Sequence, residues 1–294
     1  MIKKVHTFLF FLCCIIIYSD YKIIDKKIFF DTKQVLREVG VEKYDNPDIK
    51  TFRTISKYYA KDKYTIYRKN ENIKFSDSDT FTLLKYEFSK DKNNVYKFEN
   101  IVRGIDSNTF VLFSNQKDDF LYGYIFFKDK NGIYASSNIY DNLGNYCQLH
   151  KNEVKLESFN ILKDGYVKYN GKIYYGCKEI DKADKNTFEV LKLGFSKDKE
   201  NIYYYTNKLP KFDIDTFEIF SNQKDESYIF YLKDKNGIYA LIEESQIPFE
   251  YKVQKISADV KNFEILNDKI ARDKKYKYIF DEENKILKKI LIKG

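Results

Sequence analysis

Short runs of aromatic and β-branched residues recur along this chain, and a polar turn follows each run. Residues 81–88 form one such run, and residues 95–98 form another run after the polar segment DKNN at 91–94. Two runs of this kind with a turn between them predict a β-hairpin. The segments DKNG at 129–132 and 234–237 are strong turn sequences, because Asn and Gly tolerate positive φ angles.

The hydrophobic pattern belongs to a repeat with seven copies. Each copy has an aromatic anchor after Thr, Ser or Asn, and the anchors are Phe52, Phe81, Phe110, Phe159, Phe188, Phe217 and Phe263. A turn position follows at a fixed interval at Asp62, Asp91, Tyr169, Asp198 and Asp273, and after a longer interval at Asp129 and Asp234. A tyrosine always follows five residues after the turn position, at Tyr67, Tyr96, Tyr134, Tyr174, Tyr203, Tyr239 and Tyr278.

An aspartate also lies four residues before six of the anchors, and the fourth copy departs with Lys155. These residues are Asp48, Asp77, Asp106, Asp184, Asp213 and Asp259. The sequence Asp-x-x-Thr is a local capping pattern in which a side chain bonds nearby backbone, so a short turn or a single helical turn is expected between units.

A second, longer period relates Phe52 to Phe159, Phe81 to Phe188 and Phe110 to Phe217, because these three pairs are equally spaced. Blocks of three repeats have therefore been duplicated. Fixed periods of roughly 20 to 50 residues indicate stacked arrays, and each unit has room for two or three strands. We predict an all-β, elongated array of seven short β-hairpin repeats of about 29 residues each, with copies three and six longer. A propeller is the competing architecture, but its blades usually take about 40 residues or more.

The ends of the array are expected to be atypical. Residues 20–44 contain scattered apolar residues that suit a degenerate N-terminal capping unit, and residues 286–294 suit a closing strand. Pro/Gly/Ser-rich linkers are missing from the sequence after residue 45, so we treat residues 20–294 as one repeat domain.

Residues 1–19 resemble a secretory signal peptide, because Lys3 and Lys4 precede an apolar run too short to span a bilayer. An uncleaved anchor and a lipid attached at Cys14 are the alternatives. Export to the periplasm, the cell envelope or the medium is predicted, and contact with a membrane is expected only through this segment.

Charge and motif composition give no evidence for a cofactor, a metal or a nucleic-acid partner. Loss of Lys3 and Lys4 lowers the net charge from +8 to +6, and the remaining Lys, Asp and Glu residues are interspersed. His150 is the one histidine outside residues 1–19, and it is expected in a loop. The DKNG turns supply only the first oxygen ligands of a calcium loop. No catalytic, cofactor-binding or metal residues are predicted.

Cys147 and Cys177 are the two cysteines outside residues 1–19. An exported protein favours a disulfide between them, and two unrelated thiols are the alternative. The repeated tyrosines form a ladder that is expected to be core, although an exposed ladder would be a binding face.

Six segments of the chain share a related sequence: DKNNVY (91–96), DKNGIY (129–134 and 234–239) and DKENIYYY (198–205), with the weaker DKYTIY (62–67) and DKKYKY (273–278). They resemble the DKNYY repeat family of bacterial proteins. The fourth copy departs, with Tyr169-Asn170-Gly171 at the turn. The resemblance implies an exported or envelope-associated repeat protein of no established activity, and it transfers no catalytic residues.

These observations together predict a non-enzymatic envelope or periplasmic repeat protein that binds an unknown protein or envelope polymer. The alternatives are an envelope protein that neutralises a toxin and a hydrolase of envelope polymers. Function is expected in the insertions at 114–127 and 221–232 and in the connections at 135–153 and 240–257, because repeat arrays place specificity in such segments.

Overall fold

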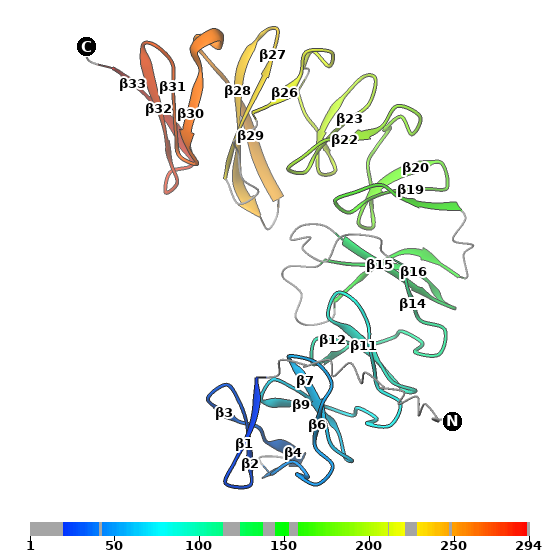
Figure 1. The fold of residues 1–294 in the computed structure, drawn as a ribbon. Coiled ribbons are helices and arrows are strands. Elements are labelled where there is room, and N and C mark those ends of the chain that lie inside the picture. The colour runs from blue at the N-terminus through cyan, green and yellow to red at the C-terminus, as the bar shows by residue number, and fades with distance from the viewer. Residues whose placement is uncertain are drawn as a thin grey trace, which may run out of the picture. The chain divides into compact units, whose positions relative to one another are not determined.

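A computed structural model describes residues 20–40, 43–113, 124–137, 145–152, 158–210, 212–220, 228–246 and 249–292. In this part of the chain each of the seven repeats forms one four-stranded antiparallel sheet (Figure 1). The strands of every sheet are neighbours in the order of the sequence, so each repeat is a simple meander. The predicted all-β array of hairpin repeats is confirmed.

The strands of the first four repeats are mostly two to four residues long. They are β6 (Arg53–Thr54), β7 (Tyr59–Lys61), β8 (Ile66–Arg68) and β9 (Glu71–Ile73); β10 (Thr82–Leu83), β11 (Phe88–Lys90), β12 (Val95–Lys97) and β13 (Asn100–Ile101); β14 (Val111–Leu112), β15 (Tyr124–Asp129), β16 (Gly132–Ser137) and β17 (Cys147–Lys151); and β18 (Phe159–Ile161), β19 (Tyr166–Tyr169), β20 (Lys172–Tyr175) and β21 (Lys178–Glu179).

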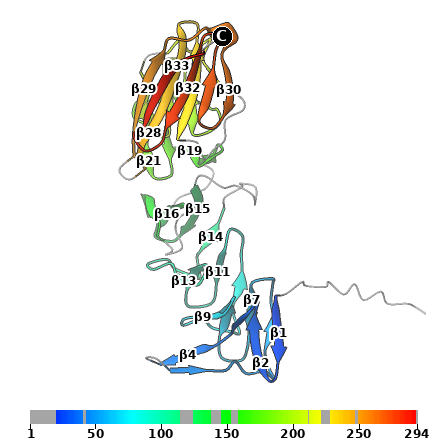
Figure 2. The same ribbon diagram turned by 90° about the vertical axis from the view of Figure 1, so that its left-hand side faces the viewer.

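The last three repeats continue this pattern with longer strands at the end (Figure 2). Their strands are β22 (Glu189–Val190), β23 (Phe195–Lys197), β24 (Ile202–Tyr204) and β25 (Asn207–Lys208); β26 (Glu218–Ile219), β27 (Ile229–Asp234), β28 (Gly237–Gln246) and β29 (Phe249–Ile256); and β30 (Glu264–Asn267), β31 (Ile270–Arg272), β32 (Tyr276–Asp281) and β33 (Ile286–Leu291). A 3₁₀ turn, η2 (Val260–Asn262), precedes the last sheet. The predicted closing strand is β33.

The expectation of two or three strands per unit was wrong, because each sheet has four. The missed strands are the outer ones, such as β10 and β13, which are two residues long. A strand of two residues shows no alternation of apolar and polar positions, so periodicity in the sequence cannot reveal it.

The chain divides into two compact units, and the boundary falls in the third repeat. Unit 1 comprises residues 1–113, 127–133 and 140–146, and unit 2 comprises residues 114–126, 134–139 and 147–294. The single domain over residues 20–294 stays a prediction.

The N-terminal residues of unit 1 form a reduced sheet next to the first repeat. Its strands are β1 (Tyr21–Ile24), β2 (Lys27–Phe30) and β3 (Lys33–Gln34), and the hairpin of β4 (Arg37–Gly40) and β5 (Lys43–Asp45) follows. Ile28 and Val35 are buried against Ala60 and Tyr67 of the first repeat. This sheet has the form of the degenerate capping unit that the sequence suggests.

The core lies between successive sheets within each unit. In unit 1, Tyr59 and Ile66 of the first repeat pack with Tyr96 of the second repeat. In unit 2, Tyr166 and Ile173 of the fourth repeat pack in the same way with Tyr203 of the fifth repeat. Apolar side chains of one sheet are thus removed from water by the neighbouring repeat, as expected for a stacked array.

Most of the repeated tyrosines belong to this core. Five of them are buried, namely Tyr67, Tyr96, Tyr134, Tyr203 and Tyr278, whereas Tyr174 and Tyr239 are partly buried. The anchor rings pack close to them, with ring centroids 5.8 Å apart for Phe52 and Tyr67 and 6.1 Å apart for Phe188 and Tyr203. The expectation that the tyrosine ladder is core agrees with the structure at the five buried positions.

Candidate functional site

In six of the seven repeats the turn aspartate is the centre of a buried hydrogen-bond network. In the second repeat Asp91 is 3% exposed. Its Oδ1 atom accepts hydrogen bonds from the backbone N–H groups of Asn93 (2.7 Å) and Asn94 (2.8 Å). Its Oδ2 atom accepts from the backbone N–H of Asp77 (2.7 Å) and from the hydroxyl of Tyr96 (2.8 Å). One carboxylate therefore connects the turn, the following strand and the segment between two repeats.

The same network recurs in all six repeats that have a turn aspartate. The upstream aspartate donates its backbone N–H to the turn aspartate in the pairs Asp48 to Asp62, Asp77 to Asp91, Asp106 to Asp129, Asp184 to Asp198, Asp213 to Asp234 and Asp259 to Asp273, over 2.7 to 3.0 Å. The hydroxyls of Tyr67, Tyr96, Tyr203 and Tyr278 donate to the same carboxylates. The side-chain NH₂ groups of Asn131 and Asn236 donate hydrogen bonds to the carboxylates of Asp129 and Asp234.

The Thr and Lys of the motif add a hydrogen bond and an ion pair to this network. Thr80 Oγ1 accepts a hydrogen bond from the backbone N–H of Lys92 (3.1 Å), and the Lys92 ammonium lies 2.6 Å from the Asp77 carboxylate. The hydrogen bond from Lys92, with those from Thr80, lowers the pKa of Asp77 to about 2. Equivalent ion pairs join Lys63 to Asp48, Lys130 to Asp106, Lys199 to Asp184 and Lys235 to Asp213.

The fourth repeat has no turn aspartate to organise such a network. Tyr169 replaces it, and the turn is made by Asn170 and Gly171, which have φ angles of 47° and 75°. The ring of Tyr169 instead packs 5.7 Å from Phe159 and 5.5 Å from His150. The expectation that His150 lies in a loop was wrong, because it belongs to β17. Aromatic contacts thus take the place of the buried carboxylate in this repeat.

Cys147 and Cys177 are joined by a disulfide bond, with their Cα atoms 6.0 Å apart. Cys147 begins β17 of the third repeat, and Cys177 follows β20 of the fourth repeat. The bond therefore links two successive repeats within unit 2.

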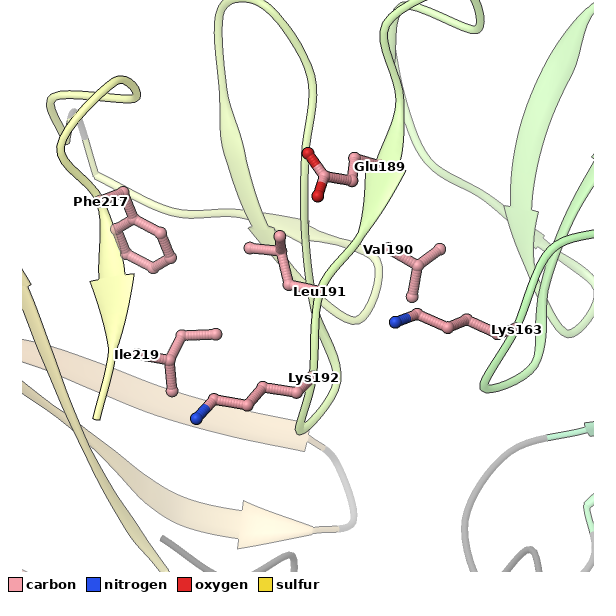
Figure 3. Close-up of a pocket in the computed structure, with 7 residues that line it drawn as sticks. All are labelled: Lys163, Glu189, Val190, Leu191, Lys192, Phe217 and Ile219. Carbon is pink, nitrogen blue, oxygen red and sulfur yellow. The ribbon is translucent and has the colours of Figure 1, made fainter. Parts of the chain in front are cut away.

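A shallow groove of about 300 Å³ lies in unit 2, across the first strands of the fifth and sixth repeats (Figure 3). Its lining residues are Lys163, Glu189, Val190, Leu191, Lys192, Phe217 and Ile219. The four apolar side chains are each partly buried and form the floor. The amino groups of Lys163 and Lys192 lie on one side of this floor, and the carboxylate of Glu189 lies on the other side (Figure 3).

The repeat pattern alone does not predict the groove, and Phe217 is the one lining residue that is also a repeat anchor. A signal was present, because Lys163 and Lys192 are separated by one short repeat interval and each follows a leucine. They occupy the same position in the fourth and fifth repeats, after the first strand of each sheet. Lysines at such positions look like ordinary surface residues until the apolar floor between them is seen.

The segments that were expected to carry function are only partly described. Residues 114–123, 138–144, 153–157, 221–227 and 247–248 lie outside the described residues, as do residues 1–19 and Lys155. The connection at 240–257 forms most of the long hairpin of β28 and β29. Its functional role stays a prediction.

Within the described ranges there is no group of three or more His, Cys, Asp or Glu residues that could hold a metal ion. Both carboxylate oxygens of Asp129 accept hydrogen bonds from the protein, as do those of Asp234. The described part of the chain likewise includes no helix with the length and apolarity needed to cross a bilayer.

These features define a class of protein, an all-β repeat array in which most units contain a buried Asp that accepts a hydrogen bond from a Tyr of the same unit. A comparison with protein families matches residues 59–207, 99–243 and 166–294 to the DKNYY family, so the chain belongs to this family. No curated protein and no solved structure matches the chain.

Proposed function

We propose that this DKNYY-family chain is an exported, non-enzymatic repeat protein that binds a macromolecular partner of the cell envelope or the medium. The observation that carries the proposal is the groove in unit 2, whose lining comes from three successive repeats. Repeat arrays present long surfaces of this kind, along which a partner contacts several units. A shallow, open groove suits a polymer chain better than a small substrate, which usually takes an enclosed pocket.

The recurring carboxylates lend no support to a catalytic role. A catalytic acid or base must reach its substrate within hydrogen-bond distance. The turn aspartates are instead buried and accept hydrogen bonds from the backbone, as Asp198 does from Asp184, Glu200 and Asn201. Their recurrence follows from the turn that they hold.

Export is supported by two features of the chain. Residues 1–19 have the composition of a signal peptide. The bond between Cys147 and Cys177 suits an oxidising compartment, where disulfides persist.

The first test combines cell fractionation with the intact mass of the purified protein. The proposal predicts an envelope or extracellular fraction that contains one of two forms of the protein. One has the mass of a chain that begins near Asp20, and the other has the mass of a chain with a lipid attached at Cys14. A full-length cytoplasmic protein refutes the export part of the proposal.

The second test is cosedimentation of the protein with isolated cell envelopes and with concentrated secreted material. The double variant Lys163→Gln/Lys192→Gln should lose binding, because both ammonium groups lie at the groove. The matched control is Lys199→Gln/Lys235→Gln, which removes the same charge from two turns of the same unit. Equal binding by both double variants would exclude the groove as the binding surface.

A further inference from the structure

The two lysines of the groove differ from the turn lysines in their electrostatic surroundings. Lys199 and Lys235 lie 2.9 and 2.5 Å from the carboxylates of Asp184 and Asp213. Among the residues that the structure describes, Lys163 and Lys192 have no carboxylate within ion-pair distance. The acid of the groove, Glu189, lies 3.6 Å from Lys197. The groove therefore has two positive charges that the described residues do not balance.

Lys192 is exposed as a residue, but its ammonium group is fixed at the groove by a hydrogen bond. Its ammonium donates a hydrogen bond to the backbone carbonyl of Phe220 at 3.0 Å. Burial lowers the pKa of Lys192, so its charged form has lost part of its hydration without gaining a counter-charge. An anionic group of a ligand would supply that counter-charge.

The floor of the groove indicates which kind of anion fits. Val190, Leu191, Phe217 and Ile219 present apolar surface beside the lysines. Burial of apolar surface is favourable by about 25 cal/mol per Å². A polyphosphate or an acidic glycan has few apolar groups to bury here, whereas a polypeptide can place aliphatic side chains on the floor and carboxylates at the lysines.

The spacing of the lysines sets the spacing of the carboxylates. Lys163 and Lys192 have equivalent positions in the fourth and fifth repeats, whose sheets pack face to face through Tyr166, Ile173 and Tyr203. Packed sheets are about 10 Å apart. A polyproline II segment has three residues per turn and a rise of about 3.1 Å, so every third side chain lies on one side at intervals of about 9 Å.

We propose that the groove binds an extended acidic polypeptide segment with a carboxylate at every third residue and aliphatic side chains between. Two successive carboxylates pair with Lys163 and Lys192, and the aliphatic side chains cover Val190, Leu191, Phe217 and Ile219. This assignment rests on the proposed function, because it names the chemistry of the partner that the same groove takes.

The test measures the fluorescence anisotropy of a fluorescein-labelled peptide, (Glu-Pro-Val)₄, titrated with the full protein at low and physiological salt. Binding should weaken with salt, and Lys163→Gln/Lys192→Gln should weaken it about tenfold, as for two modest charge pairs. Lys199→Gln/Lys235→Gln should bind as the unmodified protein does. The peptides (Lys-Pro-Val)₄ and (Glu-Pro-Ser)₄ should bind weakly, because the first reverses the charge and the second removes the aliphatic groups.

Three results would overturn the inference. They are no binding of (Glu-Pro-Val)₄, equal loss of binding in both double variants, and binding of inorganic polyphosphate in preference to the peptide. If envelopes or secreted material still bind through Lys163 and Lys192 while the peptide does not, the proposed function stands and the acidic-polypeptide assignment fails.

Discussion

Replacement of the buried turn aspartate Asp91 by asparagine should destabilise the second repeat strongly. The asparagine side chain keeps one carbonyl oxygen, which can still accept from the backbone of Asn93 and Asn94. Its amide NH₂ would then face two donors, the backbone N–H of Asp77 and the hydroxyl of Tyr96, which now lie 2.7 and 2.8 Å from Oδ2. The hydrogen bond from Asp77 is lost and its backbone N–H is left without an acceptor, whereas the Tyr96 hydroxyl can accept from the new NH₂ and donate to the Phe75 carbonyl 3.2 Å away.

The expected cost of Asp91→Asn is about 1.5 to 3 kcal/mol, the contribution of one hydrogen bond to a charged group. Tyr96→Phe removes the hydrogen bond from the Tyr96 hydroxyl to Asp91 and should cost about 1.5 to 3 kcal/mol. The double variant should lose less than the sum, because both changes affect the same bond.

The assay is urea unfolding followed by far-ultraviolet circular dichroism, with amide hydrogen exchange in the second repeat to separate local from global opening. The matched control is Asp79→Asn, which removes the same charge from an exposed residue of the same repeat. It should change the free energy of unfolding by less than about 0.5 kcal/mol. The reasoning is refuted if Asp91→Asn costs no more than this control.

Three further changes test other parts of the fold. Replacement of Cys147 and Cys177 by serine opens the loop between them and should lower the free energy of unfolding by roughly 3 to 4 kcal/mol, which thermal unfolding with and without reductant would check. Gly194→Ala should cost about 2 to 3 kcal/mol by the same assay, because Gly194 has a φ angle of 76° and an added Cβ would lie 2.7 Å from the Tyr205 ring; a neutral effect would contradict this packing. Burial raises the pKa of Glu243 above its usual 4.5. The contribution of Glu243 to stability is therefore complete below pH 4.5 and is lost as the pH rises through the raised pKa. Glu243→Gln should be more stable than the unmodified protein at neutral pH and equally stable in acid, and the opposite order in urea unfolding would contradict the raised pKa.

The sequence predicted the turn and the repeat positions of Asp77, Asp91 and Tyr96, but it did not predict the hydrogen bonds that join these residues. The regular intervals of the repeat located Asp77, Asp91 and Tyr96 as related positions, and the structure places their polar atoms within hydrogen-bond distance. Local signals sufficed for the turn and the cap, because these are set by residues close in sequence, whereas the bond from Asp77 to Asp91 joins residues that are 14 positions apart.

The groove could not be predicted in the same way. Lys163 and Phe217 belong to the fourth and sixth repeats, and they line one surface only because three sheets stack in order. A lysine is usually a solvated surface residue, and its pairing with a carboxylate is invisible in the sequence. The difference between Lys192 and a turn lysine such as Lys199 appears only when their neighbours are known.

The upstream aspartate of the motif depends on the turn that follows it. Six repeats have both aspartates, and the fourth has neither, with Lys155 and Tyr169 in their places. The upstream residue bonds the turn aspartate through its backbone N–H, which any residue except proline supplies, so this bond does not require an upstream aspartate. The upstream carboxylate instead pairs with the lysine after the turn aspartate in five repeats, and the fourth repeat has Asn170 in place of that lysine. Related chains should therefore lose the upstream aspartate and the turn lysine together.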